Sequence, residues 1–377
     1  MADIVRIISA DSHVDIQQDR VLANLPAKYH DGFREGQMRA LQRMMEQKPH
    51  KQRKQSEDQE EAAAGGFLAG AGSRELPWEA AGRPGAFDPV ARLADMDIDQ
   101  VEAEVLYTDV QGGASFYEQS DDGATLASFE AWNTAAVEFC SHDPKRLLAV
   151  YLVPIHNIEA GVKEVKRLGE EGARAIQLPL YPLDLGFAPY WDKVYDPLWE
   201  AITERGMTIS QHVGIMSYLL DGIGVHDPTP PKGIMQSLPP IFMSESLAGW
   251  LVSGVLERHP ELKIVLVEAG LGWIPYMLDR LDRMSHRHGW DHFDMPIKEL
   301  PSFYWKRNMA ATFEEDELGI SLRDHIGIEN LLWATDYPHP DSTWPESQKV
   351  IREHFKDIDV DEMRAIVGGN AARLYGL

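Results

Sequence analysis

The feature that most constrains the fold is a regular alternation of short apolar runs with longer amphipathic segments. Eight runs have the length and composition of strands: 4–10, 101–107, 147–153, 173–178, 207–211, 263–267, 308–313 and 330–335. Several are almost continuously apolar, as parallel strands buried on both faces are. Helix-like segments separate them, near 89–98, 123–141, 158–171, 192–205, 243–258, 272–288, 316–325 and 345–356, and a last one follows near 360–374.

Alternating strands and helices predict parallel βαβ units. Eight units are the number that closes a (β/α)8 TIM barrel, so we predict this α/β fold, with an open doubly wound sheet as the alternative. The 377 residues fit one elaborated barrel domain over 1–377. Only residues 31–86 interrupt the alternation of strand-like and helix-like segments. We expect this segment to be a long insertion in the first βα loop, either a surface excursion or a lid or oligomer contact.

Charge and composition exclude several classes of protein. The formal net charge is −24, which repels nucleic acid and anionic membranes at long range. No run approaches the ~20 apolar residues of a membrane span, so we expect a cytoplasmic protein. The single cysteine, Cys140, lies in an apolar helical pattern and is predicted to be a buried, inert thiol.

Polar residues stand at the ends of four predicted strands. Asp11 and His13 follow the first, His212 the fifth, Glu268 the sixth and Asp336 the eighth. Strands one and eight are neighbours in a closed barrel, and residues i and i+2 of a strand point the same way. His212 reaches the same point from the opposite side. Two imidazoles with two carboxylates predict a site for Zn²⁺, Mn²⁺ or Fe²⁺.

The chain resembles a known family over nearly its whole length. The motifs that carry the resemblance are ADSH at 10–13, RLADMDIDQVEAEVLY at 92–107, YDPLWEAITERGMTISQHVG at 195–214, LERHPELKIVLVEAGLGWIPY at 256–276, LLWATDYPH at 331–339 and GGNAARLYGL at 368–377. They are similar to the amidohydrolase superfamily, in the branch that contains aminocarboxymuconate semialdehyde decarboxylase and resorcylate decarboxylase. The resemblance implies a TIM barrel with one catalytic divalent metal, commonly zinc or manganese, and a homodimer or larger assembly.

In this resemblance Asp11 and His13 match the metal pair of the first strand, His212 the fifth-strand histidine and Asp336 the eighth-strand aspartate. Asp11 stands where the family often has histidine. Glu268 stands where many members have a catalytic histidine. The fourth strand carries no lysine at its end, which argues against the carbamylated-lysine bridge of dinuclear hydrolases. The site is therefore richer in carboxylate than is usual in the family.

The loops after the strands are rich in aromatic residues, which predicts an apolar pocket for a small molecule. We expect Tyr107, His156, Trp273 and His339 to contact this substrate.

The sequence leaves three functions open. The first is metal-assisted hydrolysis or nonoxidative decarboxylation of a small, partly aromatic carboxylic acid, with Asp336 as metal ligand and general base and Glu268 as weak ligand or acid/base. The second is a monooxygenase in which Asp11, Glu268, Asp336 and the two histidines hold two iron ions. The third is a barrel that binds without catalysis. One or two divalent ions are consistent with these residues.

Overall fold

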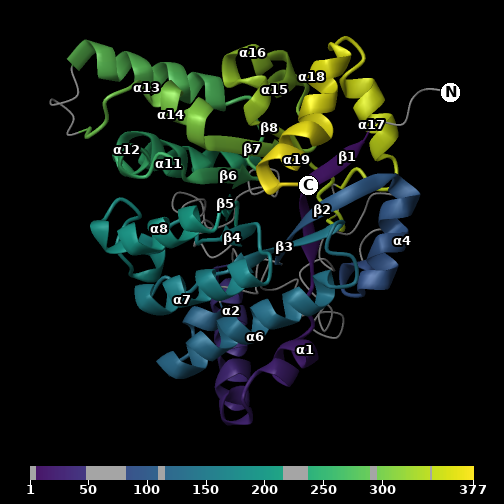
Figure 1. Cartoon of the computed structure of the whole chain (residues 1–377), viewed down its shortest axis with the longest axis vertical. Helices are drawn as coiled ribbons and strands as arrows, with labels where there is room; N and C mark the ends of the chain where they lie inside the picture. The colour runs from purple at the N-terminus through teal and green to yellow at the C-terminus, as the bar shows by residue number, and fades with distance from the viewer. Residues whose placement is uncertain (1–5, 48–81, 109–114, 215–236, 289–294, 340–341) are drawn as a thin grey trace.

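The computed structural model describes residues 6–47, 82–108, 115–214, 237–288, 295–339 and 342–377, with the backbone alone for 41, 43–47 and 286–288. Eight parallel strands follow one another around a sheet in the order β1 to β8 (Figure 1). Their bounds are β1 Ile7–Val14, β2 Val101–Thr108, β3 Leu147–Leu152, β4 Ala175–Gln177, β5 Thr208–His212, β6 Lys263–Val267, β7 Met309–Phe313 and β8 Leu331–Trp333. The predicted (β/α)8 barrel is confirmed.

The strands are enclosed by helices, as Figure 1 shows. Their bounds are α1 Gln18–Asn24, α2 His30–Gln47, α4 Pro89–Asp99, α6 Asp122–Cys140, α7 Ile158–Glu170, α8 Asp196–Glu204, α11 Pro239–Val252, α12 Val255–Arg258, α13 Ile274–His288, α14 Pro301–Asn308, α15 Glu317–Ser321, α16 Arg323–Ile326, α17 Ser347–His354, α18 Val360–Arg364 and α19 Asn370–Tyr375. Short helical turns lie at η1 Ala27–Tyr29, η3 Pro84–Ala86, η4 Pro182–Leu185, η5 Lys193–Tyr195, η7 Ile328–Asn330 and η8 Ala365–Gly369.

Helix α7 illustrates why these segments fold as predicted. Its side chains repeat at helical spacing, and Val165 and Leu168 are fully buried against the sheet. Asn157 caps its first turn, because its side-chain oxygen accepts a hydrogen bond of 3.1 Å from the backbone N–H of Ala160. Local capping and the buried stripe therefore agree on one structure.

The inside of the barrel is a separate apolar cluster. Alternate strand residues such as Val105, Val150 and Val265 form it together with Tyr375 of α19. Helix α19 follows η8, whose Gly368 lies against the backbone of β1. A Cβ on Gly368 would stand 2.6 Å from the carbonyl oxygen of Arg6, so only glycine allows this approach. The C-terminal helix thus covers the end of the barrel where the strands begin.

The seam between the last strand and the first is joined through loops and side chains. The N–H of His13 donates to the carbonyl of Tyr337 at 2.7 Å, and the N–H of Asp336 donates to the carbonyl of Asp11 at 3.0 Å. Below them, three buried hydroxyls lie 3.0–3.1 Å from one another, those of Ser9, Ser12 and Thr335. This hydroxyl triangle fixes the first strand against the eighth.

The remaining expectations have mixed outcomes. Helices α1 and α14 were not predicted. The 31–86 segment begins within α2, where Phe33 is buried and Met38 is 65% exposed. Residues 48–81 lie outside the described residues, and the lid or contact role stays a prediction.

Cys140 is buried, as predicted, and burial raises the pKa of its thiol to about 12. Within the described ranges, no helix combines the length and hydropathy needed to cross a bilayer.

Candidate metal centre

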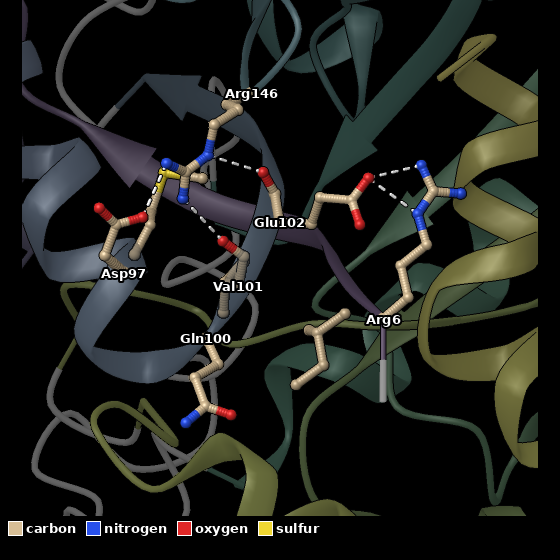
Figure 2. A pocket seen from close by; sticks show the side chains of 8 residues that line it. Arg6, Asp97, Gln100, Val101, Glu102 and Arg146 are labelled. Carbon is tan, nitrogen blue, oxygen red and sulfur yellow. Dashed lines mark hydrogen bonds and ion pairs between the residues drawn. The ribbon is translucent and has the colours of Figure 1, made fainter. Parts of the chain in front are cut away.

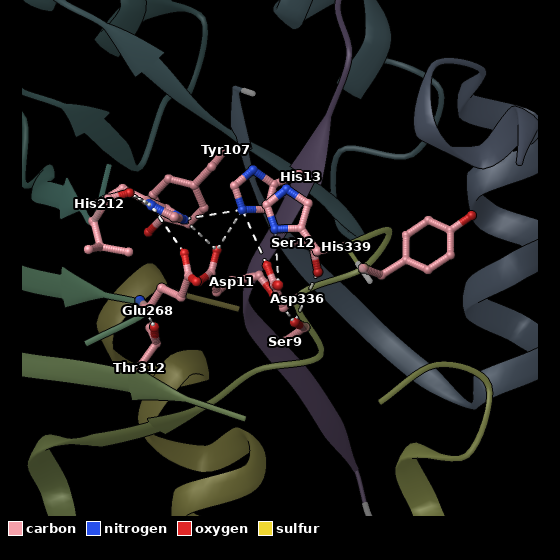
Figure 3. Close-up of polar contacts among 12 residues, drawn as sticks. Ser9, Asp11, Ser12, His13, Tyr107, His212, Glu268, Thr312, Asp336 and His339 are labelled. Atoms are coloured by element: carbon pink, nitrogen blue, oxygen red, sulfur yellow. Dashed lines mark hydrogen bonds and ion pairs between the residues drawn. The ribbon is translucent and has the colours of Figure 1, made fainter. Parts of the chain in front are cut away.

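Four side chains from three strand ends converge inside the barrel mouth (Figure 3). The Nε2 atoms of His13 and His212 lie 3.1 Å apart. Asp11 Oδ1 lies 3.5 Å from Nε2 of His212, and Asp336 Oδ1 lies 3.3 Å from Nε2 of His13. All four side chains are buried. The predicted convergence of Asp11, His13, His212 and Asp336 is therefore present.

A register shift in β1 turns two of these residues inward. Ser9 pairs with Glu104 and Ser12 with Leu106, so β1 carries one more residue than β2 between these pairs. Such a bulge changes the face to which the following side chains point. Ile8 and Ala10 belong to the inner cluster, and after the bulge His13 is paired with the inward-facing Tyr107.

The buried polar atoms at this point fit a bound cation. Both carboxylate oxygens of Asp11 and Oδ1 of Asp336 accept no hydrogen bond from the described residues. Such groups are costly to bury without a partner. Nδ1 of His212 lies 2.8 Å from the carbonyl oxygen of Val213, which can only accept. Nδ1 therefore carries the proton, and in the neutral ring the Nε2 lone pair points at the carboxylates.

His339 and Asp336 form a second contact beside the first. Nδ1 of His339 lies 3.0 Å from Oδ2 of Asp336, and its ring stacks on that of His13 at 3.9 Å. Because the two rings are nearly parallel, with an interplanar angle of 22°, their lone pairs do not converge well. His339 is thus placed to orient the Asp336 carboxylate while Oδ1 stays directed at His13.

Glu268 lies at the rim of the cluster in a strained backbone conformation. Its φ is +55°, as is that of Asp336, a region that non-glycine residues seldom occupy. Val265 and Val267 of β6 face the barrel interior, so simple alternation would turn Glu268 outward. The left-handed turn brings its Oε2 to 3.8 Å from Nδ1 of His212 instead. Its N–H donates to Oγ1 of Thr312 at 2.7 Å.

The electrostatics of the cluster favour positive charge at its centre. Burial lowers the pKa of His212, but Asp11 and Glu268 outweigh it and raise the pKa to about 9. Burial raises the pKa of Asp336, but His339 and His13 outweigh it and hold the pKa well below its usual range. For Glu268, burial and the neighbouring Asp336 raise the pKa well above the ordinary value.

The predicted substrate contacts occupy different surroundings. Tyr107 is fully buried; its hydroxyl lies 3.0 Å from Oγ of Ser210 and its ring stands edge-on to His212 at 5.3 Å. Half-buried Trp273 donates from its indole to the carbonyl of Ala269 at 2.7 Å. Their roles in substrate binding stay predictions.

His156 has a setting of its own. Its Nε2 lies 2.9 Å from a carboxylate oxygen of Asp122, and its ring contacts the aromatic rings of Tyr117, Phe129 and Phe187. A role in substrate binding stays a prediction for His156 too.

Sequence reasoning missed the residues that support the site from behind. The hydroxyl triangle is one such group. The other is Arg92, a wholly buried arginine in RLADMD, which donates to the carbonyl oxygen of His13. The available signal was the helical spacing of Arg92, Asp95 and Asp99, which puts charged residues on the face of α4 that is normally apolar.

A cavity of about 500 Å³ lies at the opposite end of the barrel (Figure 2). Its two arginines already have partners. Arg6 pairs with Glu102 at 2.7 Å, and Arg146 pairs with Asp97 at 2.8 Å. This cavity lies where the strands begin, away from the convergent histidines and carboxylates.

A TIM barrel whose strand ends gather histidines and carboxylates around one point belongs to the class of metal-dependent barrel enzymes. The family model described as Amidohydrolase matches residues 25–377. The chain belongs to this family and is an enzyme of the amidohydrolase superfamily.

Three known proteins illustrate the similarity. The chain is 23% identical over 295 residues to a 2-amino-3-carboxymuconate-6-semialdehyde decarboxylase of Dictyostelium discoideum, covering 77% of each chain. It is 25% identical over 233 residues to a gamma-resorcylate decarboxylase of Rhizobium sp., covering 55% of this chain and 64% of the relative. The fold superposes with a TM-score of 0.70 at 18% identity on 5-carboxyvanillate decarboxylase of Novosphingobium aromaticivorans, a structure complexed with manganese; the match covers 99% of this chain and 96% of that one.

Proposed function

We propose that this protein is a nonoxidative decarboxylase that acts on a small aromatic or unsaturated carboxylic acid with the help of one divalent metal ion. Asp11, His13, His212 and Asp336 would hold the ion. A bound divalent ion would polarise a substrate oxygen and help hold an anionic substrate. The observation that carries the proposal is the convergence of two imidazoles with two buried carboxylates, whose oxygens Oδ1 and Oδ2 of Asp11 and Oδ1 of Asp336 accept no hydrogen bond from the described residues.

Decarboxylation needs a proton at a defined place. The bond between the carboxylate and its carbon breaks, CO₂ leaves, and the electron pair stays on that carbon until a proton is delivered. Glu268 is placed for this delivery, because its side chain is 32% exposed at the rim of the cluster and its Oε2 lies 3.8 Å from Nδ1 of His212. Hydrolysis would instead call first for a base to activate water.

The related proteins support decarboxylation more than the alternatives. The curated relatives described above are decarboxylases, of 2-amino-3-carboxymuconate-6-semialdehyde and of gamma-resorcylate. None of the proteins described above is an oxygenase, so the di-iron monooxygenase alternative gains no support from them. Manganese is the ion in the 5-carboxyvanillate decarboxylase structure. We propose manganese, zinc or iron for this chain on the basis of its donor set.

The proposal is tested with anaerobically purified protein and a panel of hydroxybenzoic and unsaturated dicarboxylic acids. We expect close to one divalent ion per chain by elemental analysis. One CO₂ and one ring or vinyl deuterium should appear per turnover in D₂O, without oxygen consumption. A His212→Ala variant should lose both the metal and the activity. Uptake of oxygen, two irons per chain, or hydrolysis without CO₂ release would each contradict decarboxylation.

A further inference from the structure

Arg92 of α4 is the charged side chain that lies directly behind the convergent cluster. It is fully buried, and its Nη1 donates to a carboxylate oxygen of Glu104 on β2 at 2.7 Å. Its Nε donates to the carbonyl of Gly85 at 2.7 Å, and its Nη2 donates to the carbonyl of His13. The guanidinium carbon lies 4.5 Å from the centre of the Tyr337 ring. One side chain thus contacts four separate segments of the fold.

Two of those segments carry the convergent donors. His13 is itself a member of the cluster, and Tyr337 directly follows Asp336. The same two segments are joined to each other, since the N–H of His13 donates to the carbonyl of Tyr337. Arg92 therefore holds both sides of the seam at the level where His13 and Asp336 face each other at 3.3 Å.

Only a guanidinium can make this set of contacts. Its planar fork directs several N–H groups in fixed directions, while its flat face stacks on an aromatic ring. A lysine ammonium at the same place could keep the charge opposite Glu104. It has no plane to stack on Tyr337 and cannot reach Gly85, Glu104 and His13 together. The contacts also extend outward, because the hydroxyl of Tyr337 donates to Asp95 at 2.5 Å.

We propose that Arg92 is a positioning residue for the metal centre, which sets the separation of His13 and Asp336 through the carbonyl of His13 and the ring of Tyr337. This inference rests on the proposed metal function. Residues that orient metal ligands from outside typically change metal affinity about 10–100-fold when they are replaced. A purely structural arginine would affect the stability of the fold and leave the metal site unchanged.

The test compares Arg92→Lys with the wild-type chain. We expect the dissociation constant for Mn²⁺ to rise about 10–100-fold in the variant. The electron paramagnetic resonance spectrum of the bound Mn²⁺ should broaden, because the ligand geometry changes. The double variant Arg92→Met/Glu104→Gln removes both buried charges together, which folds tolerate better than the loss of one partner. It should show the same weakened binding.

Arg146→Lys is the matched control. Arg146 also joins α4 to β2, through Asp97 and the carbonyls of Val101 and Glu102, but at the far end of the barrel (Figure 2). It should lower stability at most and keep wild-type Mn²⁺ affinity. Wild-type affinity and an unchanged spectrum in Arg92→Lys would overturn the role of Arg92 alone. A wild-type protein that binds no Mn²⁺, Zn²⁺ or Fe²⁺ would overturn the metal centre and, with it, this role.

Discussion

At the scale of single residues, Glu268 carries the proton transfer that we propose. It stands beside His212 and near Asp336, in a backbone conformation that costs free energy. Its side chain is 32% exposed at the rim of the cluster, which is where the proposed proton donor has to meet a substrate. Glu268 is not one of the four proposed metal ligands, so its role can be tested separately from metal binding.

Replacement of Glu268 by Gln keeps the shape of the side chain but removes its transferable proton. We expect turnover to fall about 10²- to 10⁴-fold while metal content stays at one ion per chain. Glu315→Gln, at a carboxyl that is 59% exposed, is the control and should keep full turnover. Normal turnover in Glu268→Gln would refute the proton-donor role. A fall in metal content from near two to one would identify Glu268 as a ligand of a second ion.

At the scale of elements, α4 and α17 are connected through a buried carboxyl group. Asp99, the last residue of α4, accepts hydrogen bonds from the N–H and the hydroxyl of Ser347 at 2.9 and 2.5 Å. Ser347 begins α17, which follows the loop from β8. Burial raises the pKa of Asp99 to about 7 in spite of these hydrogen bonds.

This raised pKa predicts a dependence of stability on pH. Between about pH 4 and 7 the folded state keeps a proton on Asp99 that the unfolded state has lost, so the free energy of unfolding falls as pH rises. The stabilisation of the folded state by this proton is complete below the pKa that Asp99 has in the unfolded chain, and it is lost once the pH passes 7. Relative to Asp99→Asn, which cannot ionise, the wild type should lose up to about 4 kcal/mol over this window.

Urea unfolding at intervals from pH 4 to 8 measures the effect. Asp97→Asn, at a side chain that is 67% exposed in the same helix, serves as the control and should follow the wild-type curve. Curves for the wild type and Asp99→Asn that stay parallel throughout would show that Asp99 does not titrate in this range.

The boundaries of the helices and strands show which parts of the fold can be predicted from the periodicity of the sequence. Strand β6 has its predicted bounds, because an apolar run between turn residues can be identified from the local sequence alone. Helix α14 was missed, since the buried face of its eight residues has only Tyr304 and Trp305 as large apolar side chains and ends on the polar Asn308. The β1 bulge was also missed, because a register shift depends on a partner strand far away in sequence.

The same distinction applies to the site. The convergence of Asp11, His13, His212 and Asp336 followed from their places at strand ends. The contact from Arg92 could not be predicted in this way. It is made to a backbone carbonyl 79 positions away, and every residue has the same carbonyl group, so the sequence does not mark the partner. The left-handed turn at Glu268 likewise depends on tertiary packing rather than on residue type.

At the scale of the whole molecule, the four proposed metal ligands come from opposite walls of the barrel. Asp11 and Asp336 lie at the seam, while His212 comes from β5 on the far side. An ion bound to all of them should stabilise the folded chain as a unit. The homodimer and the cytoplasmic location remain predictions, which light scattering and fractionation would test.

Addition of Mn²⁺ to chelator-treated protein at about 100 times its dissociation constant should raise the free energy of unfolding by about 2.7 kcal/mol. The reason is that the ion binds the assembled cluster and not the unfolded chain. Scanning calorimetry should show a higher melting temperature that EDTA reverses. The net charge of −24 also attracts divalent cations weakly over the whole surface. The control is therefore His142→Ala, which removes an exposed histidine outside the cluster. His142→Ala should keep the shift, whereas an equal shift in His212→Ala would place the ion elsewhere.

The hydroxyl triangle has a consequence for how the protein is made. Ser9 and Thr335 are 326 positions apart, so the ribosome adds the second roughly 15–65 s after the first at about 5–20 residues per second. During that interval the first strand and its Asp11 and His13 have no eighth strand beside them. A nascent chain therefore cannot assemble the proposed ion-binding cluster until the eighth strand and Asp336 have left the ribosome.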